Sequence, residues 1–224
     1  MTVLQPFKDQ SIAVGPVPTL DAADVARAAR FGAATLHEAA GRIGALPSEI
    51  KPVAPNFRIA GRAFTLSGPP NDNLWLHRAM SVAEPGDVLI AHVSHFYEAG
   101  YWGEVMSTAA IAGGLAGLVI DGGVRDVTLL ELLGFPIFAR RVCISGTGKD
   151  FGALGSLAAP VMVGNVVVHA GDLVVGDADG VVVIPNKRVA EVLEKSAKRE
   201  GYEAGVMERL RAGEKSLDVF GFNR

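Results

Sequence analysis

Hydrophobic and polar residues follow two different periods along this chain, and the period changes every ten to fifteen residues. After Leu20, apolar positions recur at helical spacing, and Asp21 is placed to cap a helix that ends near Gly32. A second helical segment is expected over residues 35–41, and residues 58–67 alternate as a strand does. The first part of the chain therefore predicts two short helices followed by a strand.

The rest of the chain continues this alternation of strands and helices. Helices are expected from Asp72 or Asn73 to about residue 83, over 105–112, after Asp126 up to Gly134, and over 187–210. Strands are expected over 88–93, 118–120, 136–139, 161–168, 172–176 and 180–184, and residues 142–149 are expected to form a further strand and a turn. This order predicts one mixed α/β domain over residues 19–224, closed by a C-terminal helix, with residues 1–18 as an N-terminal arm.

Composition narrows the class of protein. The chain has 224 residues, of which 49% are hydrophobic and 20% charged, as expected of a globular protein. Its net charge of -3 gives no reason to expect nucleic acid or a membrane surface as a partner. No signal peptide is apparent, and the single cysteine, Cys143, excludes an intrachain disulfide. A cytoplasmic protein is the expectation.

The stretch Asp121-Gly-Gly-Val-Arg-Asp126 is the first candidate for chemistry. An apolar strand runs into two glycines here, so the backbone leaves the core just before Arg125 and Asp126. A guanidinium suits a substrate carboxylate or enolate, and a carboxylate is a natural ligand of Mg²⁺. The alternative is a surface ion pair, worth about 0–1 kcal/mol.

Gly103 and Glu104 form a second candidate, because a helix is expected to begin at this point. The first backbone N–H groups of a helix face any anion placed before them. Glu104 could cap the helix or hold a metal-bound water; the alternative is a glutamate that only favours the helix start.

Other candidates are weaker. His92 ends a predicted strand and His95 lies in a loop, so no shared helix face brings them together and zinc is not expected. Cys143 has apolar neighbours and is expected to be a buried thiol. Lys149 follows a fragment of a phosphate-binding loop; it could meet an acidic substrate or be an ordinary turn lysine. The Asp177–Gly180 segment is expected to form a tight hairpin turn rather than a calcium loop.

Four motifs taken together resemble a known family. They are Gly68-Pro-Pro-Asn-Asp-Asn, Trp102-Gly-Glu, Gly117-Leu-Val-Ile-Asp-Gly-Gly-Val-Arg-Asp and Gly176-Asp-Ala-Asp-Gly-Val-Val-Val-Ile-Pro. In this order and spacing they are similar to the 4-hydroxy-4-methyl-2-oxoglutarate / 4-carboxy-4-hydroxy-2-oxoadipate aldolases, in the superfamily of the ribonuclease E activity regulator A. The resemblance covers roughly residues 20–220.

The resemblance implies a phosphohistidine-domain-like α/β/β/α sandwich that assembles into homotrimers or homohexamers with active sites between subunits. It implies Mg²⁺ or Mn²⁺ bound directly by Asp126, with Glu104 and Glu203 holding metal-bound waters. Glu203 would come from the neighbouring subunit; Glu200 is the alternative. Arg125 would bind the pyruvyl group, and the backbone of Gly103 and Val105 its carboxylate.

The implied activity is that of a lyase of aromatic-compound breakdown, which releases pyruvate and decarboxylates oxaloacetate as a side reaction. Two alternatives stay open. One is a non-catalytic, regulator-like protein that binds another protein; Glu104 and Glu203 favour the enzyme. The other is the same enolate chemistry on a different 2-oxo acid, because residues 151–159 depart from the family pattern and the loop 95–98 could alter substrate preference.

Overall fold

The computed structural model describes residues 14–223, so most of the expected N-terminal arm lies outside the described residues. The helices are α1 (Ala22–Ala28), α2 (Ala33–Ala39), α3 (Leu74–Met80), α4 (Glu104–Ala112), α5 (Val127–Leu133), the 3-10 helix η1 (Asn186–Arg188), α6 (Val189–Arg211) and α7 (Ser216–Val219). The strands are β1 (Lys51–Pro52), β2 (Ile59–Ser67), β3 (Asp87–His92), β4 (Gly100–Trp102), β5 (Gly117–Val124), β6 (Ile137–Val142), β7 (Ser156–Leu157), β8 (Val161–Val163), β9 (Val166–Val168), β10 (Leu173–Asp177) and β11 (Gly180–Ile184).

The main sheet has the strand order β1-β6-β5-β3-β2-β10-β11, and its centre is parallel. Strand β3 pairs in parallel with β2 and with β5, and β5 pairs in parallel with β6 and β4. Every residue of β5 is buried. A parallel strand covered on both faces has no polar side to show, which explains why this segment is a nearly continuous run of apolar residues and glycine.

The two ends of this sheet are joined by one segment of chain. The backbone N–H of Leu46 donates to the Val181 carbonyl and that of Val183 donates to the Gly44 carbonyl, both over 2.9 Å, so residues 44–46 lie along β11. A few residues later the chain forms β1, which pairs with β6. The sheet is therefore nearly closed.

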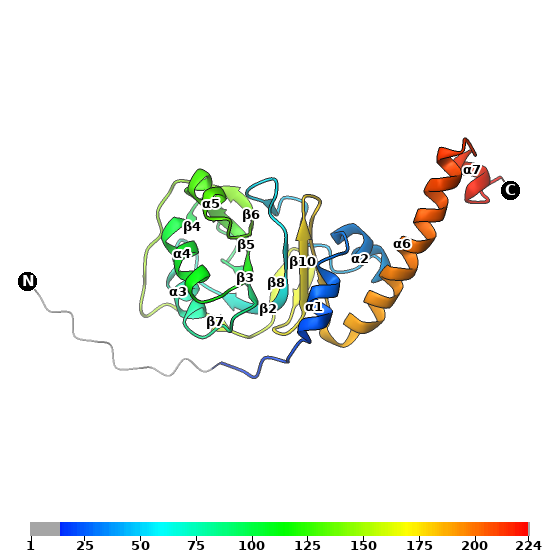
Figure 1. Cartoon of the computed structure of the whole chain (residues 1–224). Coiled ribbons are helices and arrows are strands. Elements are labelled where there is room, and N and C mark those ends of the chain that lie inside the picture. Colours follow the sequence, from blue (N-terminus) through cyan, green and yellow to red (C-terminus); the bar gives the residue numbers. More distant parts are fainter. Residues whose placement is uncertain (1–13, 224) are drawn as a thin grey trace, which may run out of the picture.

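Strands β10 and β11 form a second β layer, as their alternating side chains show. Leu173, Val175, Val182 and Ile184 pack in a cluster with α1, α2 and α6, whereas Val174, Val181 and Val183 pack into the main core with β3, β5 and β6. Figure 1 shows α3, α4 and α5 on the far side of that core and α1, α2 and α6 beside β10. The layers run helix, strand, strand, helix, which confirms the expected α/β/β/α sandwich.

Most expected elements are present with small shifts at their ends. Asp21 Oδ1 accepts a hydrogen bond from the Ala23 N–H over 2.8 Å and caps α1 as expected. Helix α2 begins earlier than expected, because Asp177 of the β10–β11 turn accepts a hydrogen bond from the Ala33 N–H. The hairpin turn expected at Asp177–Gly180 joins β10 to β11.

The expectation of two strands over residues 136–139 and 142–149 is wrong. One strand, β6, runs through Ile137–Val142, and residues 143–147 leave the sheet. Arg140 and Arg141 interrupt the apolar pattern and so suggested a break. The strand continues through them because Arg140 forms an ion pair with the buried carboxylate of Asp121 on β5.

Helix α6 extends well beyond the body of the molecule. Its buried residues are Val189, Val192, Leu193 and Ser196 in the first half, and Val206 near the far end. Figure 1 shows its second half leading away from the sheet to α7. No helix in residues 14–223 is both long and apolar enough to cross a membrane.

Candidate active site

The candidate site lies where the parallel strands β4 and β5 end side by side. The backbone N–H of Arg125 donates to the Trp102 carbonyl over 2.9 Å, which holds the two strand ends together. Gly103 and Glu104 therefore leave β4 next to the point where Arg125 and Asp126 leave β5. The carboxyl ends of parallel strands are where α/β folds most often bind ligands.

Asp126 has an unusual backbone conformation that sets the direction of its side chain. Its φ of 62° is left-handed, which is uncommon for a residue other than glycine. Asp126 is the N-cap of α5, yet its side chain makes no hydrogen bond to that helix. Instead Asp126 Oδ2 accepts a hydrogen bond from the Glu104 N–H over 3.1 Å. The carboxylate thus faces the N-terminus of α4, whose dipole stabilises negative charge.

Two glycines let the backbone approach these side chains closely. A Cβ atom at Gly103 would lie 2.2 Å from Asp126 Oδ2, and one at Gly100 would lie 2.4 Å from the Cys143 carbonyl oxygen. A side chain at Gly100 would thus clash with the backbone, and one at Gly103 would require the Asp126 carboxylate to move. We call the group of Gly103, Glu104, Arg125 and Asp126 the cradle.

Arg125 and Asp126 are only loosely paired. Arg125 Nε lies 3.8 Å from Asp126 Oδ2, and the two side chains are 48% and 36% exposed. A pair this open contributes about 0–1 kcal/mol to stability. No hydrogen bond occupies the guanidinium within residues 14–223, so its donors are available to a ligand.

Lys149 lies on a segment that borders the cradle. Gly146 is close to Arg125, since a Cβ atom there would lie 3.8 Å from Arg125 Nη1. The Gly148 N–H donates to the Asn71 carbonyl over 2.8 Å, which fixes the segment against the loop before α3. Lys149 is exposed and, within the described part of the chain, has no ion pair.

Glu203 is the predicted site residue that a single chain does not bring to the cradle. It lies on α6, where its carboxylate pairs with Arg199 Nε over 2.8 Å. Helix α6 is in the layer opposite α4 and α5 (Figure 1). The side chains of Glu104 and Val105 are at the cradle and exposed. A contribution of Glu203 from a neighbouring subunit stays a prediction.

The donor atoms at the cradle fit a lightly coordinated divalent metal ion. Within residues 14–223, no group of three or more His, Cys, Asp or Glu side chains could hold a metal ion. Mg²⁺ often takes only one or two carboxylates and keeps several waters. Asp126 accepts its hydrogen bond on Oδ2 alone, which leaves Oδ1 for a metal. Asp126, with Glu104 beside it, suits Mg²⁺ or Mn²⁺.

His92 and His95 lie on no shared helix, as expected, yet their rings are in contact. Their ring centroids are 4.8 Å apart in an edge-to-face contact, although no helix carries them. The loop after β3 achieves this with two left-handed residues, Ser94 and His95. Burial, and secondarily the charge of His95, lowers the pKa of His92, while Asp121 acts in the opposite direction.

Sequence reasoning missed a group of polar side chains on the central strands. His92 on β3 is the register partner of Asp121 on β5, and Asp121 pairs with Arg140 on β6. The signal available was a histidine, an aspartate and an arginine, each directly after a run of apolar residues. Cys143 is half-buried rather than fully buried as expected, because it lies where the chain leaves β6.

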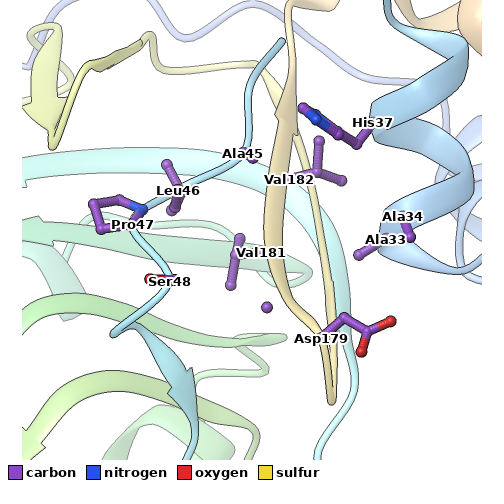
Figure 2. Close-up of a pocket in the computed structure, with 11 residues that line it drawn as sticks. Ala33, Ala34, His37, Ala45, Leu46, Pro47, Ser48, Asp179, Val181 and Val182 are labelled. Carbon is purple, nitrogen blue, oxygen red and sulfur yellow. The ribbon is translucent and has the colours of Figure 1, made fainter. Parts of the chain in front are cut away.

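A separate cavity of about 250 Å³ lies between α2 and residues 45–48, above β11. Figure 2 shows His37 at one end, Asp179 at the other, and Val181 and Val182 between them. His37 Nδ1 is 3.0 Å from the Ile43 carbonyl oxygen, so the imidazole fastens the turn after α2. None of the predicted site residues lines this cavity.

Comparison with known proteins places this geometry in a family. The chain belongs to the Aldolase/RraA family, whose RraA-like model matches residues 19–183. A provisionally named 4-hydroxy-4-methyl-2-oxoglutarate aldolase from Halalkalibacterium halodurans is 37% identical over 155 residues, which is 69% of this chain and 73% of that protein.

Two solved structures share the fold. An uncharacterised protein from Pseudomonas syringae pv. tomato superposes with a TM-score of 0.81 at 25% identity, over 96% of this chain and all of the other. The Streptomyces coelicolor protein RraAS2, described as an unusual member of the RNase ES inhibitor RraA family, has a TM-score of 0.76 at 26% identity, over 84% of this chain and 98% of the other.

Proposed function

We propose that the chain is a divalent-metal-dependent (class II) pyruvate aldolase. Its substrate would be 4-hydroxy-4-methyl-2-oxoglutarate or 4-carboxy-4-hydroxy-2-oxoadipate, cleaved to pyruvate and a second 2-oxo acid. One observation carries the proposal. The Glu104 N–H donates a hydrogen bond to Asp126 and so holds this carboxylate at the N-terminus of α4, beside an Arg125 guanidinium that is only loosely paired. The name of the Halalkalibacterium halodurans relative supports the same activity.

The cradle offers each group that the substrate's pyruvyl end requires. Mg²⁺ or Mn²⁺, held by Asp126 and through water by Glu104, would polarise the 2-oxo group when bound. Arg125 binds the carboxylate or enolate oxygens through its planar fork and offsets their negative charge. The backbone N–H groups of the first turn of α4, including that of Val105, face the same carboxylate.

Cleavage requires the loss of one proton and the gain of another. The C4 hydroxyl gives up its proton, the C3–C4 bond breaks, and its electron pair moves into the enolate of pyruvate. We assign the removal of the C4 hydroxyl proton to the Glu104 carboxylate, which would act through a water, because this exposed side chain belongs to the cradle. Protonation of the enolate carbon then gives pyruvate. Oxaloacetate decarboxylation passes through the same enolate and is the expected side activity.

The surface around the cradle supports assembly into a homotrimer or homohexamer. Four large apolar side chains, on α4, on α5 and in the segments after β6 and before β7, are exposed in a single chain, with fractions of 79% for Val105, 78% for Leu132, 89% for Ile144 and 90% for Leu154. Large apolar side chains that gather in one exposed patch are typical of a protein interface, and we expect these four to be covered in the oligomer. In such an assembly Glu203 of a neighbouring subunit would complete the shell of the metal.

A regulator-like role is the second candidate, favoured by the structural similarity to RraAS2. Such a protein would bind another protein through its surface and would not need the metal. Asp126→Ala would then leave partner binding unchanged in a pull-down.

One assay tests the proposal directly. Purified protein is supplied with Mg²⁺ or Mn²⁺ and a panel of 4-hydroxy-2-oxo diacids and oxaloacetate, and pyruvate is measured with lactate dehydrogenase. We expect pyruvate release that stops on chelation and in Arg125→Ala or Asp126→Ala. Absence of both aldol cleavage and decarboxylation would overturn the aldolase proposal.

A further inference from the structure

The loop of residues 94–99, between β3 and β4, brings two imidazole rings together at the end of β3. The rings of His92 and His95 are in edge-to-face contact, with their centroids 4.8 Å apart. Ser94 and His95 hold this position with left-handed backbones, at φ values of 51° and 59°. Left-handed residues other than glycine persist where surrounding contacts fix them, and they are often found in segments that switch between two states.

Contacts from its own side chains fasten the loop to β6. Tyr97 OH lies 3.2 Å from His95 Nδ1, and the Arg140 guanidinium lies over the Tyr97 ring, 4.7 Å from its centroid. Glu98 pairs with Arg141 over 3.6 Å. Both arginines are on β6, so the position of the His95 ring depends on contacts between the loop and that strand.

Asp121, on the strand between β3 and β6, is a buried carboxylate with one oxygen unused. Its Oδ1 accepts a hydrogen bond from Arg140 on β6, whereas its Oδ2 has no hydrogen-bond partner within residues 14–223. On the other side of β5, the register partner of Asp121 is His92. The His92 imidazole makes no hydrogen bond in the described part of the chain. A protonated His92 would be a suitable donor to the unused oxygen.

The surroundings of His92 favour its neutral form while the loop is closed. Burial lowers the pKa of His92, the charge of His95 lowers it further, and Asp121 acts in the opposite direction. The other ionisable groups of the cluster already have partners; they are Tyr97, Arg140 and Glu49. The closed loop is therefore fully favoured above the ordinary histidine pKa of about 6.5, and it becomes less favoured as pH falls through that value.

The same loop supports the strand that leads into the cradle. Tyr101 OH donates a hydrogen bond to the Phe96 carbonyl over 3.0 Å and accepts one from the Asn71 N–H over 2.9 Å. Strand β4 ends at Trp102, directly before Gly103 of the cradle. A movement of the loop therefore removes a support of β4.

We infer that the loop of residues 94–99 is a proton-controlled latch on the start of β4. With both imidazoles neutral, the edge contact between His92 and His95 keeps the loop closed. When His92 takes up a proton from solvent, it donates to Asp121 Oδ2, its contact with His95 breaks and the loop opens. The latch does not depend on the proposed aldolase chemistry, because it acts on the backbone around β4 whether or not a substrate is cleaved.

Hydrogen exchange followed by mass spectrometry tests the latch on the full-length protein. Peptides that cover residues 93–101 are compared at pH 7.5 and 5.5, after correction for the intrinsic exchange rate at each pH. We expect the protection of these peptides to fall about tenfold on acidification, since a difference of one pKa unit between the closed and open loop corresponds to that factor. His92→Gln should change by less than about twofold over the same range, because it has no proton to take up.

Two further variants and an internal control complete the experiment. His95→Gln removes the ring contact and should show low protection of the loop at both pH values. His169→Gln removes an exposed histidine after β9 and should keep the wild-type response. Peptides from β10 and β11 report on global unfolding, and their protection should fall less than that of the loop.

Three results would overturn the latch. They are a wild-type loop whose protection does not depend on pH, an equal fall in the loop and in β10 and β11, and an unchanged pH response in His92→Gln. Thermal unfolding at pH 7.5 checks the fold of each variant, and His92→Asn replaces His92→Gln if the latter is unstable.

Discussion

The backbone N–H of Glu104 donates a 3.1 Å hydrogen bond to Asp126 Oδ2, and this contact joins the start of α4 to the start of α5. The two residues are far apart in the sequence but follow strands that are paired. The left-handed backbone of Asp126 turns its carboxylate back towards β4. The position of the proposed metal ligand thus depends on backbone geometry as much as on its own side chain.

Gly103→Ala should disrupt the cradle although glycine contributes no functional group. The added Cβ would lie 2.2 Å from Asp126 Oδ2, so the carboxylate must move. A displacement of about 1 Å at a catalytic group can cost roughly a hundredfold in rate. We expect kcat/KM for pyruvate release to fall by about that factor. Gly113→Ala at the end of α4, where the nearest atoms are 3.5 Å away, should retain activity; equal losses would contradict the prediction.

Asp126→Asn should abolish metal-dependent activity and preserve the fold. Asparagine tolerates the left-handed conformation and still accepts the hydrogen bond from the Glu104 N–H, but it lacks the negative charge that a metal ion requires. Calorimetric titration with Mn²⁺ should show binding to the wild-type protein and none to the variant. The free energy of unfolding should change by less than about 1 kcal/mol. Unchanged Mn²⁺ affinity would remove Asp126 from the metal site.

The two periods of the sequence predicted one mixed α/β domain, and the resemblance to the aldolase family implied its α/β/β/α layers. Alternating residues such as Val174 and Val175 pack on opposite faces of β10, as a period of two requires. The sequence also placed Arg125 and Asp126 just outside a strand, but it could not show that β4 ends beside β5. That contact depends on pairing between segments about twenty residues apart, and the apolar pattern of a segment does not show which strand it pairs with. The contact of His92 with His95 was not predictable either, because it depends on the left-handed backbone of Ser94 and His95.

Breaking the ion pair between Arg140 and Asp121 should lower the free energy of unfolding far more than breaking the exposed pair between Arg141 and Glu98. Asp121 is 1% exposed, and its Oδ2 has no hydrogen-bond partner in the described structure, so it relies on Arg140. Arg140→Met should lower the free energy of unfolding by about 3–5 kcal/mol in urea titrations, because it leaves a buried charge unpaired. Arg141→Met removes an exposed arginine from the same strand and should cost about 0–1 kcal/mol. Similar costs for the two variants would argue against the pair's importance.

Acidification should weaken the fold partly through His92 and His77. Burial lowers the pKa of both imidazoles in the folded protein, so unfolding below pH 7 takes up protons. Their contribution to the free energy of unfolding is therefore complete above the unfolded pKa of about 6.5 and declines as pH falls through it towards the folded values. Urea titrations between pH 7.5 and 5 should show a shallower decline in His77→Gln/His92→Gln than in the wild-type protein. An identical slope would mean that neither histidine is linked to folding.

Leu154→Asp should dissociate the proposed oligomer without unfolding the protomer. Leu154 is 90% exposed within one chain, so the substitution costs the isolated fold almost nothing, yet a carboxylate in an apolar interface is strongly unfavourable. Size-exclusion chromatography with light scattering should show a trimer or hexamer for the wild-type protein and a smaller species for the variant. Met162→Asp is the matched control, because Met162 is an exposed apolar residue on β8, away from the cradle, and its replacement should leave the mass unchanged. A monomeric wild-type protein would remove both the interface and the contribution of Glu203, since that residue reaches the cradle only from a second chain.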